Sequence, residues 1–515
     1  MAALVARPLS WWGVFLLPLL SPPLLSMRAQ GSRREEEATL KPLVAELRSG
    51  DKWVRKRAVE ALARLGSEAA WEHVVLALAD PKGEVADTAE VLLGGIPEEA
   101  FPHLCGKEGL GARDPWVRRR AAEALGRSSF PPEADALAEG LRDPDPEARR
   151  MALFSVERLA AEENLSPEAV EGLLPLVQRL ASSERDDLAR ARALFALALL
   201  DPEEARPQVL GAAQERAPGL RAAAARLLPR IAERGSAETE LARLASDPAR
   251  AVRTSAAHAL AELGTRAAVL LLISRMEAEE QGRLSLRILD DLRRLSGLKH
   301  PLDPRPWRDW AGLLPEDWKG TLATRVAAPP EGGTAASFAG LPILSTRLAI
   351  LIDLSGSIWK QRSDGRTKKE VVDRKLREAL EGLPETTRFN LIPFTETPRP
   401  WQKSLVEATR KNVESAARFF EDRKESGTGN FWDAALLALE DPEVDTLLVL
   451  TDGVPTGGRR NQLELLVPLF LERNATAEVA VDSILVEAPP RIRKRWEALA
   501  EATGGLSIAI DLRAP

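Results

Sequence analysis

The chain is 515 residues long, with 44% apolar residues, 29% charged residues and a formal net charge of -6. This length exceeds what one hydrophobic core usually organises, so we expect two or more domains. The weakly acidic balance argues against a general nucleic-acid binder, which would carry a basic surface. The chain has a single cysteine, Cys105, which excludes an intrachain disulfide and a cysteine-based zinc cluster. No histidine follows residue 300, which excludes local histidine-based catalysis in the C-terminal half.

The N-terminal segment predicts export. Residues 9–25 are predominantly apolar, follow Arg7 and are interrupted by three prolines. A basic start, a short apolar stretch and small residues after it are typical of a secretory signal peptide, here with cleavage near Ala29. The alternative is a membrane anchor, which needs about 20 apolar residues without such breaks. We therefore interpret residues 1–29 as a signal peptide and expect a periplasmic or extracellular protein, with peripheral membrane association left open.

From residue 36 to residue 300 the chain repeats the pattern V-R-x-x-A-x-x-A-L. It is clearest as VRKRAVEAL at Val54, VRRRAAEAL at Val117 and VRTSAAHAL at Val252, with looser copies starting at 85, 148, 189, 220 and 284. Successive copies start 31 or 32 residues apart, except for 41 residues between 148 and 189. A fixed period of this size indicates stacked units, and the apolar spacing within each copy predicts a helix with one buried face.

Many copies follow a turn that carries an aspartate. We expect these side chains to cap the next helix, because they can accept hydrogen bonds from its free N–H groups. They are Asp51, Asp80, Asp114, Asp145 and Asp247. With a second apolar helix before each copy, the units resemble HEAT repeats. The resemblance implies an α-solenoid over residues 36–300, which either binds a partner or serves as a plain scaffold.

Arginines cluster within one of these copies, at Arg118, Arg119 and Arg120. Acidic residues interleave with the basic ones throughout the helical half, and no basic stripe dominates. We interpret the cluster as a solvated helix face and expect no nucleic-acid partner.

Three tryptophans, Trp307, Trp310 and Trp318, follow the last copy. We expect them to close the end of the solenoid, where the last apolar face would otherwise meet water; a stacking surface for a sugar or a base is the alternative. After residue 320 the periodicity is lost and Pro and Gly accumulate, as in a linker. Residues 301–337 are thus interpreted as a solenoid cap and linker.

From residue 338 to residue 513 apolar strands alternate with amphipathic helices. The expected strands are RLAILID, RFNLIPF, DTLLVLTD, EVAVDSILV and LSIAIDL, and the expected helices lie near 369–383, 410–422, 431–440, 461–473 and 491–502. Near-continuous apolar strands separated by helices predict a parallel sheet covered on both faces. The expected fold class is therefore an α-solenoid followed by a doubly wound, Rossmann-like α/β domain.

Oxygen-bearing side chains gather where three of these segments end. Asp353, Ser355 and Ser357 follow the first strand, Thr428 stands between two glycines before a helix, and Asp452 ends DTLLVLTD. In open α/β sheets ligands bind beyond the carboxyl ends of the strands. We therefore expect these five side chains to lie together at one edge of the sheet.

In this order, D-x-S-x-S, a glycine-flanked threonine and strand-T-D-G resemble the von Willebrand factor type A domain with its metal-ion-dependent adhesion site. The resemblance implies that Ser355 and Ser357 bind a divalent cation directly, and that Thr428, Asp353 and Asp452 bind it directly or through water. Hydroxyl and carboxylate oxygens suit a hard cation, Mg²⁺ in first place, with Mn²⁺ or Ca²⁺ as alternatives. An acidic side chain of a protein partner could complete the coordination.

The sequence as a whole predicts an exported binding protein that captures a protein partner through a divalent cation, and not an enzyme. Two other readings stay open. In one, the chain is a structural scaffold with a vestigial metal site; in the other, it is an accessory subunit of an ATPase complex. The partner and the oligomeric state do not follow from the sequence.

Overall fold

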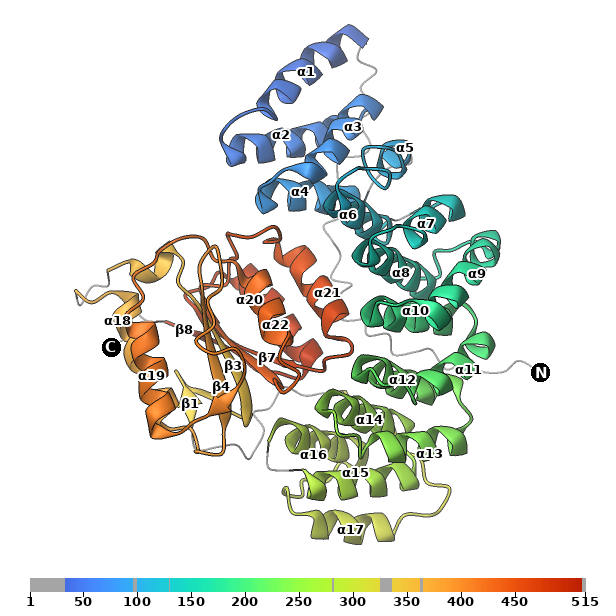
Figure 1. The fold of residues 1–515 in the computed structure, drawn as a ribbon, viewed down its shortest axis with the longest axis vertical. Helices are drawn as coiled ribbons and strands as arrows, with labels where there is room; N and C mark the ends of the chain where they lie inside the picture. The colour runs from blue at the N-terminus through green and yellow to red at the C-terminus, as the bar shows by residue number, and fades with distance from the viewer. Residues whose placement is uncertain are drawn as a thin grey trace.

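The computed structural model describes residues 33–95, 100–128, 130–279, 282–324, 336–361 and 365–511. A curved row of helices is followed by an α/β domain that lies against the inner side of the curve (Figure 1). The predicted signal peptide at 1–29 and the Pro/Gly-rich stretch 325–335 fall outside the described residues. None of the helices in this part of the chain is long and apolar enough to span a membrane.

The curved row is the expected α-solenoid. Its even-numbered helices α2 to α16 carry the repeated V-R pattern and line the inner side, while most odd-numbered helices cover the outer side (Figure 1). The helices are α1 Arg33–Glu46, α2 Lys52–Leu65, α3 Glu68–Leu76, α4 Gly83–Leu93, α5 Phe101–Cys105, α6 Pro115–Leu125, α7 Ala134–Leu141, α8 Pro146–Ala161, α9 Pro167–Ser183, α10 Asp187–Leu200, α11 Pro202–Ala212, α12 Pro218–Ile231, α13 Arg234–Leu244, α14 Arg250–Leu263, α15 Arg266–Ala278, α16 Arg283–Ser296 and α17 Pro304–Gly312.

Where a copy has the arginine of the V-R pattern, this side chain links it to the next copy. Arg118 donates two hydrogen bonds to the carboxylate of Asp143, at 2.6 and 2.9 Å, and two more to the carbonyls of Ala112 and Arg113 in its own turn. Bidentate, charge-assisted pairs of this kind are among the stronger polar contacts in proteins. The same arrangement recurs at Arg55, Arg149, Arg221 and Arg253, with Asp80, Glu184, Asp247 and Glu279 as acceptors.

The prediction that the turn aspartates cap helices holds for three of them and is wrong for two. Asp51, Asp114 and Asp145 accept a hydrogen bond from a backbone N–H in the first turn of α2, α6 and α8. Asp80 and Asp247 stand too early, because α4 and α14 begin three residues after them. Their carboxylates instead accept from the backbone two residues on and from the V-R arginine of the preceding copy.

The tryptophans after the last repeat form an edge-to-face row at the end of the solenoid. The ring centroids of Trp307 and Trp310 lie 6.0 Å apart, and those of Trp310 and Trp318 lie 5.6 Å apart. Trp307 is fully buried and its indole N–H donates to the carbonyl of Pro301. Because Trp307 packs into the core, it offers no free face on which a base or a sugar could stack.

The α/β domain is a six-stranded sheet in the order β5-β4-β3-β6-β7-β8, parallel except for β5. The five expected strands and five expected helices are present, which confirms the doubly wound fold. A short β1–β2 hairpin and the edge strand β5 were not expected. The elements are β1 Ser337–Phe338, β2 Leu341–Pro342, β3 Arg347–Asp353, α18 Lys368–Glu381, β4 Arg388–Phe394, β5 Val406–Glu407, α19 Arg410–Glu421, α20 Phe431–Leu439, β6 Thr446–Thr451, α21 Leu463–Asn474, β7 Ala480–Val486, α22 Pro490–Thr503 and β8 Ser507–Ile510.

The two faces of the sheet belong to different apolar clusters. Along β3, Leu348, Ile350 and Ile352 face the cluster under α18 and α19, whereas Ala349 and Leu351 face the opposite side. This alternation follows from the period of two in a strand. On the second side, α20, α21 and α22 share one continuous apolar cluster with the solenoid (Figure 1). The two halves of the chain therefore share an apolar core on this side of the sheet.

Candidate metal site

The strand order creates a crevice at the carboxyl ends of β3 and β6. The chain leaves β3 toward one side of the sheet and β6 toward the other, and ligands bind at such a switch point in doubly wound folds. Asp353 is the last residue of β3, and Asp452 directly follows β6. The topology therefore places both predicted carboxylates at the crevice.

Asp353 is buried and held by its neighbours. Its Oδ1 accepts a 2.8 Å hydrogen bond from the backbone N–H of Ser355, and its Oδ2 accepts a 2.9 Å bond from the hydroxyl of Thr451. Burial raises the pKa of Asp353 to about 6; the Ser355 N–H opposes this shift, and the nearby Asp452 carboxylate adds to it. A cation in the crevice would favour the ionised form of this group.

The two predicted serines are brought next to each other and next to the threonine loop. The hydroxyls of Ser355 and Ser357 lie 3.3 Å apart, and Ser357 stands in a short 3₁₀ turn, Gly356–Trp359. Ser355 forms a β-bridge with Gly427, whose carbonyl accepts a 3.2 Å hydrogen bond from the N–H of Gly356. This bridge ties the serine loop to the segment that carries Thr428.

Thr428 has a buried hydroxyl oxygen without a hydrogen-bond partner among the described residues. The next residue, Gly429, lies so close to Asp353 that a Cβ there would be 2.8 Å from its Oδ2. Close approach of the backbone thus requires glycine at that position. Buried polar atoms in folded proteins almost always have a partner, so an orphaned hydroxyl oxygen at this crevice fits the role of a cation ligand.

A small cavity lies at the same edge of the sheet. Asp353, Ser357 and Asp452 line it, together with Thr451 and Lys368, and its volume is about 20 Å³, the room of a single water-sized sphere. Within the described ranges, no three His, Cys, Asp or Glu side chains gather into a metal-binding group. Hydroxyls must therefore supply part of any coordination shell, and two carboxylates with three hydroxyls fit a hard divalent cation such as Mg²⁺.

Comparison with known proteins finds one family model and several partial relatives. HEAT repeats match residues 107–179. The chain is 31% identical to inter-alpha-trypsin inhibitor heavy chain 4 of Mus musculus over 133 residues, which is 24% of this chain and 14% of that protein. It is 32% identical to the human heavy chain H2 over 123 residues, or 22% of this chain and 12% of that one. The chain thus spans only a small part of these relatives' length.

Two solved structures are similar to parts of the chain. One is a von Willebrand factor type A protein from Catenulispora acidiphila, with 18% identity, a TM-score of 0.27, and coverage of 33% of this chain and 39% of that one. The other is human deoxyhypusine hydroxylase, with 21% identity, a TM-score of 0.23, and coverage of 54% and 96%. The decisive observation is internal to the chain: the D-x-S-x-S segment sits at the switch point of a sheet with one antiparallel edge strand. The chain carries HEAT repeats and a von Willebrand factor type A (VWA) domain.

The VWA domain packs against the inner face of the HEAT solenoid, where a row of buried arginines on the solenoid helices contacts it. Arg192 donates to the side chain of Glu472 at 3.2 Å and to its carbonyl at 2.8 Å. Arg250 donates to the carbonyls of Ala477 and Glu478, at 2.6 and 3.0 Å. Three more arginines continue the row along the inner helices, namely Arg120 to the carbonyl of Arg459, Arg150 to Glu472 and Arg283 to Asp482.

The interpretation of Arg118, Arg119 and Arg120 as a solvated face is therefore wrong. Arg118 and Arg119 are paired with Asp143 and Asp145, and Arg120 is 3% exposed at the domain interface. The sequence held one signal of this role. Copies that start at 117, 148 and 189 carry a second arginine two or three residues into the pattern, which the V-R contact does not use.

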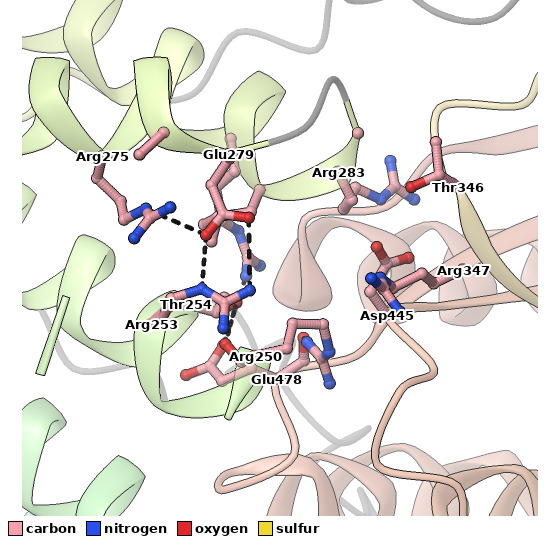
Figure 2. Close-up of a pocket in the computed structure, with 14 residues that line it drawn as sticks. Arg250, Arg253, Thr254, Arg275, Glu279, Arg283, Thr346, Arg347, Asp445 and Glu478 are labelled. Atoms are coloured by element: carbon pink, nitrogen blue, oxygen red, sulfur yellow. Dashed lines mark hydrogen bonds and ion pairs between the residues drawn. The ribbon is translucent and has the colours of Figure 1, made fainter. Parts of the chain in front are cut away.

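A cavity of about 240 Å³, larger than the one at the candidate metal site, lies between the end of the solenoid and the amino ends of β3 and β6. Arg347 at the start of β3 borders it on the VWA side, and Figure 2 shows Arg253 and Arg275 of the solenoid converging on Glu279. Because these two arginines already have a carboxylate partner, we regard the cavity as part of the ion-pair network. It lies at the amino ends of the strands, away from the candidate metal site.

Proposed function

We propose that this protein binds a protein partner through a divalent cation held in its VWA domain by Asp353, Ser355, Ser357, Thr428 and Asp452. HEAT repeats and VWA domains both serve generally in protein–protein interaction, and together they make the chain an interaction scaffold. The observation that carries the finer proposal is the orphaned Thr428 hydroxyl beside a crevice with two carboxylates.

The chemistry of the site favours binding over catalysis. Mg²⁺ prefers oxygen ligands and keeps several exchangeable positions, so two carboxylates and three hydroxyls leave room for an outside ligand. A carboxylate from a partner protein would complete the coordination of the ion, and the ion would then bridge the two chains. The VWA half contains no histidine and no cysteine, which removes the commonest general base and the thiol nucleophile.

Calorimetric titration of the full chain with Mg²⁺ tests the site. The variant Thr428→Val keeps the volume of the side chain and removes the hydroxyl, and we expect it to weaken Mg²⁺ binding roughly tenfold or more, as loss of one ligand does. Thr387→Val is the matched control, because the Thr387 hydroxyl is also buried without a partner among the described residues but precedes β4 at the other end of the sheet. Equal binding by both variants would contradict the proposed ligand set.

Affinity capture tests the bridge. The full chain is immobilised and exposed to an extract in Mg²⁺, and proteins that elute on chelation are identified. We expect a partner that is retained by the wild type, released by chelator and absent with Asp353→Ala. A partner that stays bound in excess chelator would rule out the ion bridge.

The leader-like N-terminal segment supports a location outside the cytoplasm. N-terminal sequencing of the mature protein is expected to start after Ala29. An intact N-terminus together with cytoplasmic fractionation would instead favour the accessory subunit of an ATPase complex.

A further inference from the structure

The loop between β6 and α21, residues 452–462, contacts both the candidate metal site and the solenoid. Its first half holds the threonine segment: the hydroxyl of Thr456 accepts a 3.0 Å hydrogen bond from the N–H of Gly429. The N–H groups of Thr456 and Gly457 in turn donate to the carbonyl of Gly429, at 3.1 and 3.2 Å. Gly429 directly follows Thr428, so this half of the loop determines where the Thr428 hydroxyl lies.

The second half of the loop is held by helix α4 of the solenoid. Glu90 accepts two hydrogen bonds from Arg460, at 2.6 and 2.7 Å. Asp87 accepts from the backbone N–H groups of Asn461 and Gln462, at 2.6 and 3.0 Å. The side chains of Asp87 and Glu90 are completely buried. Gln462 is the N-cap residue of α21 and makes no side-chain capping bond, so Asp87 of the other domain fixes the backbone just before this helix.

Arg120 completes the contact from α6. It donates to Asp87 at 2.6 Å, to Glu90, and to the carbonyl of Arg459 in the loop. Helix α4 also packs directly on the loop backbone, since a Cβ added at Gly83 would lie 2.7 Å from the carbonyl oxygen of Gly458. We call Asp87, Glu90 and Arg120 the loop clamp.

We propose that the loop clamp positions the candidate metal site, so that the solenoid sets the affinity of the VWA domain for its cation. By fixing residues 458–462, the clamp keeps Thr456 and Gly457 against the Thr428 segment. The inference rests on the proposed function of the site. Coupling between two sites is reciprocal, so cation binding must in turn tighten the contact between the loop and α4.

The test compares Mg²⁺ affinity in two variants of the full chain. Glu90→Gln removes the charge that holds Arg460. Glu472→Gln is its matched control, because Glu472 is an equally buried interface carboxylate paired with Arg150 and Arg192. Glu472 lies at the far end of α21, ten residues after Gln462. The helical rise places it about 15 Å from the clamped start of this helix.

We expect Glu90→Gln to weaken Mg²⁺ binding about fivefold or more, the usual scale of coupling between sites, and Glu472→Gln to bind like the wild type. Unchanged affinity in Glu90→Gln, or equal losses in both variants, would overturn the clamp. A wild type that binds no Mg²⁺ would refute the proposed function itself. A wild type that binds while Glu90→Gln binds equally well refutes only the clamp.

Hydrogen exchange of the wild type keeps the proposal testable if Glu90→Gln does not fold. Addition of Mg²⁺ is expected to slow exchange in α4 and at residues 459–462, but not in α12. Unaltered exchange of α4 under saturating Mg²⁺ would count against the coupling. Gly83→Ala adds a second variant, in which the new methyl group meets the Gly458 carbonyl and lowers Mg²⁺ affinity.

Discussion

The backbone of Gly457 runs so close to Thr428 that a Cβ at residue 457 would lie 2.3 Å from the Thr428 hydroxyl oxygen. The following residue, Gly458, has a φ of +82° and lies equally close to the side chain of Asn430. Asn430 in turn caps α20 through its Oδ1. Two consecutive glycines thus allow the loop after β6 to lie directly on the segment before α20, and this contact places the orphaned hydroxyl at the crevice.

Gly457→Ala is expected to weaken Mg²⁺ binding roughly tenfold, or about 1.4 kcal/mol. The added methyl group occupies the space of the Thr428 hydroxyl and forces it to rotate away. Titration calorimetry measures the affinity, and thermal unfolding shows whether the fold is retained. Gly211→Ala serves as the control, because a Cβ at this solenoid position meets no atom within 4 Å. Wild-type affinity in Gly457→Ala would show that Thr428 is not a ligand.

Mg²⁺ affinity is expected to fall as the pH drops through about 6, because burial raises the pKa of Asp353 to about 6. Below that pH a proton competes with the cation, so affinity drops roughly tenfold per pH unit. Titration calorimetry at pH 5, 6, 7 and 8 measures this slope. Affinity that is constant from pH 5 to pH 8 would contradict the role of Asp353.

The Asp353 carboxyl also affects the stability of the metal-free protein. Low pH weakens Mg²⁺ binding, but it stabilises the metal-free fold. The folded pKa of Asp353 is raised above the ordinary 3.8, so the proton favours the folded state at low pH. This contribution is lost as the pH rises through about 6, and the difference amounts to about 3 kcal/mol. Added Mg²⁺ should restore stability at pH 7, and Asp353→Asn should remove the dependence.

The sequence was sufficient for most of the VWA fold and for the placement of Asp353 and Asp452 at the same edge of the sheet. RLAILID and RFNLIPF are strands with the expected bounds. Short, near-continuous apolar runs bounded by polar turns favour a buried strand over other secondary structure. Once the strands are parallel, Asp353 and Asp452 must meet at one edge. Strand β5 and the β1–β2 hairpin have two residues per strand and therefore carry no periodic signal.

The interface between the domains could not be predicted in the same way. Arg120 lies in a helix whose pattern of charged residues is typical of a solvent-exposed face. Its partners Glu90 and Arg459 lie 30 and 339 residues away along the chain, and local periodicity carries no information about such pairs. The V-R arginine is similar: the pattern revealed the repeat, but not that Arg118 reaches the carboxylate of Asp143 in the next turn.

Arg221→Lys is expected to destabilise the solenoid by about 1–2 kcal/mol. Arg221 binds Asp247 through two hydrogen bonds, at 2.7 and 2.8 Å, and also donates to two carbonyls of its own turn. The single ammonium group of lysine cannot make this bidentate contact. Denaturant unfolding of Arg221→Lys, Asp247→Asn and the double variant gives the coupling energy. Strictly additive effects would show that the pair contributes nothing specific.

Glu478→Gln is expected to lower the stability of the full chain by about 3–5 kcal/mol, the cost of breaking a buried ion pair. The Glu478 carboxylate accepts hydrogen bonds from Arg226 and Ser255, at 2.9 and 3.0 Å, and lies 3.5 Å from Arg287. The substitution removes a buried negative charge that these two solenoid arginines contact in the VWA domain. Because both domains share one apolar cluster, we expect the wild type to unfold in a single transition. We expect the variant to unfold at a lower denaturant concentration than the wild type.

The pH dependence of stability gives a second measure of the same contact. Burial raises the pKa of Glu478, but Arg226 and Arg287 outweigh it, so the net shift is downward from the ordinary 4.5. A lowered folded pKa means that the stabilisation is present above pH 4.5 and is lost as the pH falls below it. Glu421→Gln is the control, because its half-exposed pair with Arg377 contributes at most about 1 kcal/mol. Equal effects of the two substitutions would show that the contact of Glu478 with Arg226 and Arg287 does not hold the domains together.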